Sequence, residues 1–253
     1  MIVDTHIHLY DEKFKDQLNE IIDNAFNNNV NKLICVGCDY DTSKKCIELA
    51  SKYPFIYCAV GIHPSEVQKE EDLELSWIYE LAKNDKVVAI GEIGLDYYWD
   101  KSYIELQKSF FIKQIQIANK LNLPVIIHSR DAHLDTYEIL KQNRCRGVLH
   151  CYSSSLELAR EYVKMGMYLG IGGVLTFTNS KEIKRVVEEI DIDHLVTETD
   201  APYLAPVPYR GKINKPEYLP LIIEKISTLK NQNKEIIEEK LYNNAHRLFN
   251  IKH

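Results

Sequence analysis

Short runs of Val, Ile and Leu recur along the chain, and between them apolar residues return every three or four positions. The runs predict eight β-strands, at residues 2–6, 33–37, 55–61, 87–91, 125–128, 147–150, 167–171 and 195–199. The segments between them predict helices, most clearly where Phe111, Ile115, Ala118 and Leu121 form one apolar stripe. Asp131 and Ser155 stand at expected helix starts, and helices near 216–230 and 234–249 end the chain.

Strands that alternate with helices predict a parallel sheet, because parallel strands need crossover connections. An open, doubly wound sheet is the structural alternative. Eight repeats in 253 residues favour an α/β fold of the (β/α)8 TIM-barrel type. No linker or low-complexity tract divides the chain, so we expect one hydrolase barrel domain over residues 1–253.

Composition narrows the classes of function. The net charge of −6 provides no global positive field for nucleic acid, so an anionic substrate needs a local feature to capture it. No secretory signal is visible at the start, and no apolar run is long enough to span a bilayer, so we expect a cytoplasmic protein without a membrane association. The six cysteines, Cys35 and Cys38 among them, are interpreted as reduced thiols.

Residues that ligate metals or move protons stand where the apolar runs end. In chain order they are His6 and His8, His63, Glu92, His128, His150, and Glu198 with Asp200. Side chains alternate along a strand, so His6 and His8 share a face, as do Glu198 and Asp200. In a barrel the carboxyl ends of all strands meet at one mouth, where active sites lie.

A single histidine at a strand end is more often a structural residue than a ligand. His194 and His246 are interpreted in that way, and His133 is expected to lie on a helix. Several imidazoles and carboxylates at one barrel mouth, however, are costly to bury unless a cation compensates them. The sequence therefore predicts a metal site. No Walker-type or dinucleotide-binding glycine motif is present, and Gly170, Gly172 and Gly173 are expected to permit close approach at the seventh strand.

Taken together, these motifs resemble the TatD family of metal-dependent deoxyribonucleases, within the amidohydrolase superfamily. The matching stretches are residues 3–9, 61–64, 91–97, 128–130, 150–152, 198–203, 210–214 and 244–249. The resemblance implies two divalent ions, with Zn, Mn, Mg, Ni and Co as candidates. It implies that His6, His8, Glu92 and Asp200 hold one ion, and that Glu92, His128 and His150 hold the other, with Glu92 as the bridge.

On this basis the sequence suggests a TatD-like deoxyribonuclease that attacks a phosphodiester of DNA with a metal-activated water. Asp200 is the predicted general base, and His63 is assigned to phosphate contact or to protonation of the leaving group, or else packs beside Pro64. Asp4 and Glu198 are expected either to orient metal-bound imidazoles or to pair with buried basic groups.

Four further residues are candidate substrate contacts: Arg130, Tyr203, Arg210 and Lys212. Tyr97, Tyr98 and Trp99 can either stack a base or pack their own loop.

Other functions on the same metal site stay open at this stage: an amidase, a lactonase, a phosphotriesterase or a D-aminoacyl-tRNA deacylase, because function resides in loops that vary on a common barrel. A non-catalytic binding protein is the other alternative, although no predicted ligand is missing. Metal identity, exonuclease or endonuclease action, strand polarity and oligomeric state are not determined by the sequence.

Overall fold

The structure is a computed structural model that describes residues 1–251. All eight predicted strands are present, and they form one sheet in the order β1 to β8. Their bounds are β1 Ile2–Ile7, β2 Val30–Val36, β3 Ile56–Val60, β4 Val87–Asp96, β5 Val125–Arg130, β6 Gly147–Leu149, β7 Tyr168–Ile171 and β8 Leu195–Thr197. The five pairings described in register are parallel, and Ile7 of β1 also makes a parallel bridge to Ala201, beyond the end of β8. This connectivity is that of a (β/α)8 barrel, so the predicted fold class is confirmed.

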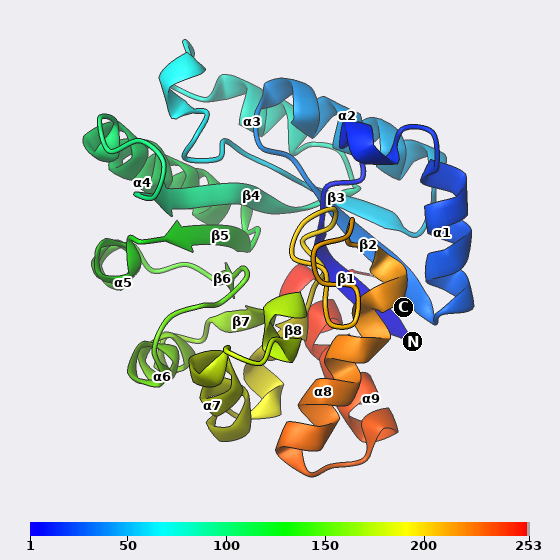
Figure 1. The fold of residues 1–253 in the computed structure, drawn as a ribbon. Coiled ribbons are helices and arrows are strands. Elements are labelled where there is room, and N and C mark those ends of the chain that lie inside the picture. Colours follow the sequence, from blue (N-terminus) through cyan, green and yellow to red (C-terminus); the bar gives the residue numbers. More distant parts are fainter. Residues whose placement is uncertain (252–253) are drawn as a thin grey trace. The chain divides into compact units, whose positions relative to one another are not determined.

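Helices fill the segments between the strands (Figure 1). They are α1 Leu18–Asn27, α2 Tyr40–Lys52, α3 Ser76–Leu81, α4 Ile104–Leu121, α5 His133–Gln142, α6 Leu156–Lys164, α7 Lys181–Glu189, α8 Leu219–Lys230 and α9 Lys234–Phe249. Short 3₁₀ turns lie at Glu12–Phe14, Val67–Lys69, Gly173–Thr176, Ile192–His194 and Pro216–Tyr218. In the predicted apolar stripe of α4, Phe111, Ile115 and Ala118 are fully buried.

The chain divides into two compact units, which are described separately. The terminal unit comprises Met1–Cys35 and the chain from Cys151 onward, and the central unit comprises Val36–His150. In the terminal unit α9 packs on β1 and β8, and α8 lies beside α9 (Figure 1). In the central unit α4 packs on β4, which pairs with β5.

Strand β4 is longer than the sequence pattern predicts. The expected strand ends at Gly91, whereas the observed strand continues to Asp96 because residues 93–96 pair with residues 127–130 of β5. Glu92 therefore lies inside the strand and not at its end. Gly94, at φ +139°, permits this close pairing, since a Cβ at this position would lie 2.0 Å from the carbonyl oxygen of His128.

The two predicted helix starts have different outcomes. Ser155 is the N-cap of α6, and its hydroxyl accepts a hydrogen bond from the backbone N–H of Leu158. The prediction for Asp131 was wrong, because Ala132 precedes α5 and makes no side-chain cap. Asp131 instead has φ +53° in the turn after β5, a left-handed conformation that Asp adopts more readily than most residues.

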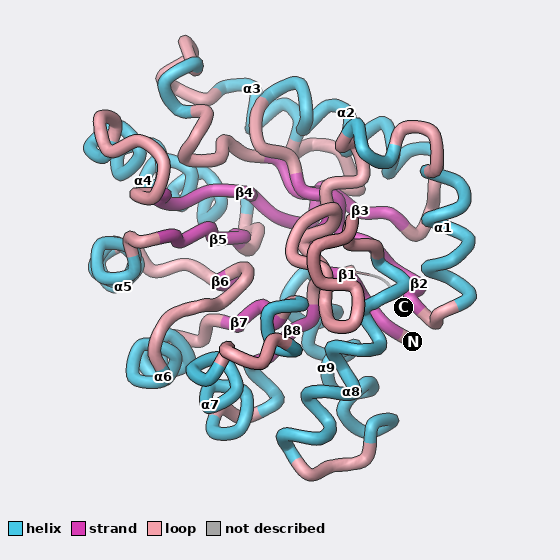
Figure 2. Tube along the Cα trace, viewed as in Figure 1, coloured by secondary structure: helices cyan, strands magenta, loops and turns pink. Residues whose placement is uncertain are grey.

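A long loop connects β8 to α8 and is folded without further helix or strand until Pro216 (Figure 2). Its first part is fixed to the end of β1 by backbone hydrogen bonds, from the Asp200 N–H to the His6 carbonyl and from the His8 N–H to the Ala201 carbonyl, each 2.9 Å. These two hydrogen bonds hold the segment after β8, which carries Asp200, beside the end of β1, which carries His6 and His8. Among residues 1–251, no helix combines the length and the apolar character that crossing a membrane requires.

Candidate metal centre

Three predicted ligands of the terminal unit converge at the ends of β1 and β8. The Nε2 atoms of His6 and His8 lie 3.2 Å apart. The Oδ1 atom of Asp200 is 3.8 Å from the first of these nitrogens and 3.4 Å from the second. Two ligands at about 2.1 Å from a common tetrahedral ion lie about 3.4 Å from each other. The three atoms therefore have the spacing of three corners around one divalent cation, and the donor set of two imidazoles and a carboxylate suits it.

The backbone holds Asp200 in the position that this spacing needs. Asp200 has φ +57°, and its carbonyl accepts a hydrogen bond of 2.8 Å from the Tyr203 N–H. Behind it, the N–H and the hydroxyl of Thr199 donate to the carboxylate of Asp4 at 2.9 and 2.6 Å. The amide of Asn214 donates to the Thr199 carbonyl at 2.7 Å. Asp4, Thr199 and Asn214 are buried, so solvent does not compete for the hydrogen bonds that hold the backbone next to Asp200.

Asp4 thus holds the start of the loop after β8, through its hydrogen bonds with Thr199. It also accepts a hydrogen bond of 3.3 Å from the backbone N–H of His6, and its described bonds include neither a ring nitrogen nor a basic side chain. Among the described residues, Asp4 therefore neither orients an imidazole nor pairs with a basic group, the two roles expected from the sequence. Burial raises the pKa of the Asp4 carboxyl from 3.8 to about 7, against the Thr199 and His6 hydrogen bonds that lower it.

The imidazole of His8 is oriented by a residue that the sequence analysis did not name. Its Nδ1 atom lies 3.1 Å from the hydroxyl of Tyr10, which leaves Nε2 directed toward His6 and Asp200. Tyr10 follows His8 by two positions, and this spacing was the available signal. Glu198 is fully buried and accepts the backbone N–H of Cys151. A Cβ at Gly170 would lie 2.4 Å from Oε2 of Glu198, so this glycine provides the room that the carboxylate occupies.

The central unit has a second cluster, which surrounds Glu92. Its Oε1 atom lies 3.0 Å from Nδ1 of His128, 3.6 Å from Nε2 of His150 and 3.7 Å from Nε2 of His63. The ligand atoms of His63, Glu92 and His128 all lie within 4.8 Å of one another, a separation that one metal ion can span. The predicted set of Glu92, His128 and His150 is brought together around one carboxylate oxygen, and His63 joins it.

Asp96 is the functional residue that sequence reasoning missed in this cluster. Its Oδ2 atom lies 3.0 Å from Nε2 of His128, so the imidazole is held between two carboxylates. Burial raises the pKa of Asp96, but the hydrogen bond from His128 and that from the Tyr98 N–H outweigh it, and the pKa lies below 3.8. Burial lowers the pKa of His128, while the bonds to Asp96 and Glu92 raise it above 6.5 overall. Residues 92, 94 and 96 share a strand face, which would have identified Asp96 had the strand been predicted to its full length.

The hydrogen bonds of His63 determine its neutral tautomer. Its Nδ1 atom accepts the backbone N–H of Ser65 at 3.1 Å, and a backbone N–H can only donate. In the neutral ring the proton is therefore on Nε2, the nitrogen that faces Glu92. A protonated Nε2 suits a hydrogen-bond donor better than a metal ligand.

The four predicted substrate contacts are surface residues of two different units. Arg130, in the central unit, places its guanidinium 3.7 Å from the ring centre of Tyr98 and 5.5 Å from that of Trp99. In the terminal unit, Arg210 lies 4.3 Å from the ring centre of Phe177 and Lys212 lies 5.8 Å from that of Tyr209.

The fourth of these residues, Tyr203, also belongs to the terminal unit. It is 45% exposed and donates to Asp11 at 3.1 Å. All four side chains are accessible to a ligand.

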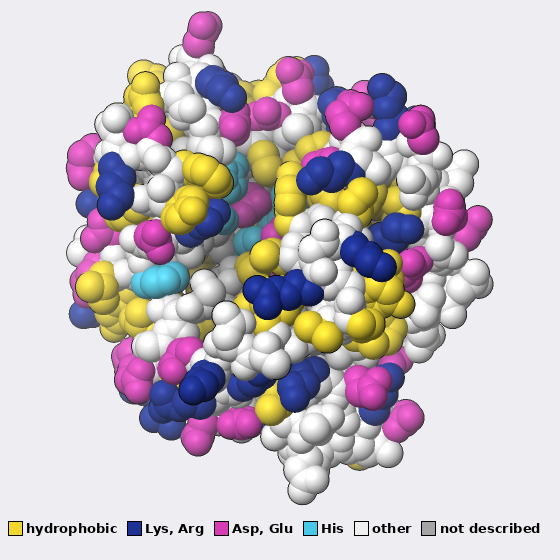
Figure 3. Space-filling model, viewed as in Figure 1, with side chains coloured by type: hydrophobic (Ala, Val, Ile, Leu, Met, Phe, Trp, Pro, Cys, Tyr) yellow, Lys and Arg dark blue, Asp and Glu magenta, His cyan; other side chains and the backbone are white. Residues whose placement is uncertain are grey.

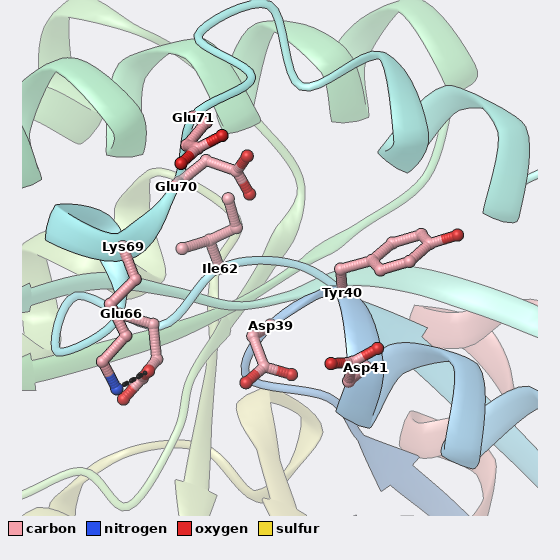
Figure 4. A pocket seen from close by; sticks show the side chains of 8 residues that line it. All are labelled: Asp39, Tyr40, Asp41, Ile62, Glu66, Lys69, Glu70 and Glu71. Carbon is pink, nitrogen blue, oxygen red and sulfur yellow. Dashed lines mark hydrogen bonds and ion pairs between the residues drawn. The ribbon is translucent and has the colours of Figure 1, made fainter.

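Two other regions of the surface carry mixed or acidic charge. Over α6 and α7 basic and acidic side chains alternate (Figure 3), and several form ion pairs, such as Arg160 with Glu189 and Arg185 with Glu182. A hollow of about 400 Å³ in the central unit is lined by Asp39, Tyr40, Asp41, Ile62, Glu66, Lys69, Glu70 and Glu71 (Figure 4). Three of its carboxylates have described partners: Asp39 caps α2 by accepting the Thr42 N–H, Glu66 pairs with Lys69, and Glu70 accepts the indole N–H of Trp77. This acidic hollow disfavours a phosphate.

The fold and the two clusters of imidazoles and carboxylates define a metal-dependent hydrolase of the barrel type. The model of the TatD-related DNase family matches residues 3–250. The chain belongs to this family.

Similar proteins include two that bear the name metal-dependent hydrolase. YabD of Bacillus subtilis (strain 168) is 45% identical over 254 residues, which cover 99% of this chain and all of that protein. YcfH of Escherichia coli (strain K12) is 34% identical over 257 residues, which cover 99% of this chain and 96% of that protein. The crystal structure of YjjV, a TatD homologue from Escherichia coli, superposes with a TM-score of 0.92 at 30% identity and covers 99% of this chain and 98% of that one.

Proposed function

We propose that this protein is a divalent-metal-dependent deoxyribonuclease that hydrolyses phosphodiester bonds of DNA. The observation that carries the proposal is the spacing of the His6, His8 and Asp200 ligand atoms, together with the Glu92 cluster, in a chain of the TatD-related DNase family. That both clusters act in one active site rests on the family resemblance, which implies Glu92 as a shared ligand.

Bound divalent ions would supply an activated water and would offset the negative charge that develops on the phosphoryl oxygens. The protein's own groups act on the attacking water and on the leaving group. Asp200, with its carboxylate at the ligand cluster, accepts the proton of the attacking water. His63 carries its proton on Nε2, because Ser65 occupies its Nδ1, and this N–H donates a hydrogen bond to the leaving oxygen or to a phosphate oxygen. The leaving oxygen takes its proton from solvent.

The substrate phosphates are contacted by Arg130, Arg210 and Lys212. Three such contacts on a single strand give a slope of log affinity against log salt of about −2, because each contributes about 0.7. This modest dependence agrees with the net charge of −6. A slope several times steeper would contradict the proposed contact set.

A panel of substrates tests the reaction class. The purified protein is supplied with Mg²⁺, Mn²⁺ or Zn²⁺ and assayed on DNA, RNA, a simple phosphodiester, esters, lactones, amides and a D-aminoacyl-tRNA. We expect metal-dependent cleavage of DNA that is lost on chelation and restored when the metal is returned. Turnover restricted to amides, to lactones or to the aminoacyl ester would refute the nuclease and identify the alternative.

A further inference from the structure

A small hollow in the central unit lies next to the Glu92 cluster. It holds about 170 Å³ and is lined by Pro64, Ser65, Gln68, Asp96, Trp99, Asp100, Tyr103 and Gln107. Two of these residues connect it to the cluster: Asp96 bonds His128, and Ser65 bonds His63. The hollow is smaller than the roughly 300–1,000 Å³ of pockets for drug-sized ligands, so it suits a single ring system.

The hollow carries two exposed aromatic rings. Trp99 is 74% exposed and Tyr103 is 39% exposed. Trp99 meets Tyr98 edge to face, with ring centres 4.8 Å apart, which leaves most of the indole accessible. The faces of such rings stack nucleobases of any sequence. Exposed rings beside the Glu92 cluster therefore offer a stacking surface to a base of the substrate.

Charge determines which part of a nucleotide fits. Asp96 and Asp100 line the hollow, and these two acidic side chains disfavour a phosphate inside it. Arg130 places its guanidinium 5.5 Å from the ring centre of Trp99. Arg130 beside the indole can bind a phosphate, and the two acidic side chains exclude a phosphate from the hollow. This arrangement fits a nucleotide whose base enters the hollow and whose phosphate lies at Arg130.

We propose that this hollow is a base subsite, in which Trp99 stacks a nucleobase next to the scissile phosphate while Arg130 contacts the phosphate of that nucleotide. The proposal rests on the proposed nuclease function and specifies its substrate: a nucleic acid with a base at this position. Trp99 here is a binding residue, and the hydrolytic chemistry does not depend on it.

Fluorescence tests the binding step directly. The chain has two tryptophans, Trp77 and Trp99, so Trp77→Phe leaves Trp99 as the sole indole and Trp99→Phe leaves Trp77. Deoxyadenosine monophosphate contains no phosphodiester to cleave, so it serves as the probe. We expect it to quench the emission of the Trp77→Phe protein, and deoxyribose 5-phosphate, which has no base, to leave it unchanged. The Trp99→Phe protein should show no quenching with either compound.

Cleavage tests the same contact in the working enzyme. Two oligonucleotides are compared, one intact and one with an abasic position next to the scissile bond. For the wild type we expect kcat/KM to fall roughly 5- to 150-fold on the abasic strand, the range that loss of one stacked base produces. Trp99→Ala should lose about the same factor on the intact strand and should cleave both strands at equal rates. Trp77→Phe is the matched control and should behave as the wild type.

The outcomes separate the two proposals. Cleavage of DNA without quenching at Trp99, or a Trp99→Ala protein that still discriminates between the strands, would overturn the base subsite and leave the nuclease standing. Quenching by the nucleotide without cleavage of any phosphodiester would support the subsite and refute the nuclease. Equal quenching by deoxyribose 5-phosphate would show that the hollow does not recognise a base, which also overturns the subsite.

Discussion

The carboxylate of Asp96 offers the sharpest test of how the central cluster works. In the observed geometry its Oδ1 accepts the Tyr98 N–H at 2.9 Å, and its Oδ2 lies 3.0 Å from Nε2 of His128. Asp96→Asn keeps the first bond through the remaining oxygen and places an NH₂ group against Nε2. An NH₂ group requires an acceptor, so the imidazole proton moves to Nδ1, the nitrogen that faces Glu92. A protonated Nδ1 cannot bind a metal ion.

The size of the effect follows from burial. Asp96 is 4% exposed, so solvent screens the bond to His128 very little. A hydrogen bond to a charged partner contributes about 1.5–3 kcal/mol, which corresponds to roughly 10- to 150-fold in an equilibrium constant. Loss of a partner that orients a metal-bound histidine typically costs about 10- to 100-fold in metal affinity. We therefore expect metal affinity at the Glu92 cluster to fall by about 10- to 100-fold.

The assay is a competition titration of Zn²⁺ against a chromogenic chelator, which resolves two binding constants. In Asp96→Asn we expect unchanged metal affinity at the cluster of His6, His8 and Asp200, and an affinity lowered by that factor at the Glu92 cluster. Asp72→Asn is the matched control, because Asp72 is a central-unit carboxylate that accepts the backbone N–H groups of Glu74 and Ser76. Two ions bound with wild-type affinity in Asp96→Asn would refute the tautomer argument.

Three further predictions concern other parts of the protein. Glu92→Ala should abolish metal-dependent cleavage and weaken both ions, measured by turnover and by the same titration, and near-normal turnover would remove the proposed mechanism. Thr199→Val should lower the free energy of unfolding by about 1–3 kcal/mol, because it leaves the buried Asp4 carboxylate without its hydroxyl donor. Urea unfolding measures this effect, and an unchanged midpoint would contradict the role of Asp4 in fixing the loop. Lys108→Met should destabilise the protein near pH 7, since Lys108, 2.8 Å from Asp135, holds the pKa of that carboxyl below 3.8. A carboxyl whose pKa is lower in the folded protein than in the unfolded chain stabilises the fold at pH values above the unfolded pKa. The difference in unfolding free energy between wild type and Lys108→Met should therefore shrink as the pH falls below 3.8. A difference that grows at low pH would contradict the role of Lys108.

The sequence alone determined the strands, their order and most of the candidate ligands. Apolar runs that alternate with helical segments admit few arrangements other than a parallel sheet, and the eight strands lie where these runs predict them. His6 and His8 share a face because strand side chains alternate, and their Nε2 atoms meet 3.2 Å apart. Local geometry of this kind is encoded in the spacing of the residues.

Only the tertiary structure decided which partners these residues have. The pairing of β4 with β5 extends the strand to Asp96 and brings its carboxylate to His128, 32 positions away. The contact of Asp4 with Thr199 spans 195 positions. Hydrogen bonds of this type depend on register and on loop conformation, which result from packing of the whole sheet and leave no periodic signal in the chain. The sequence thus specified which chemical groups are present, and the strand register and loop conformations of the folded chain specified which of them form hydrogen bonds with one another.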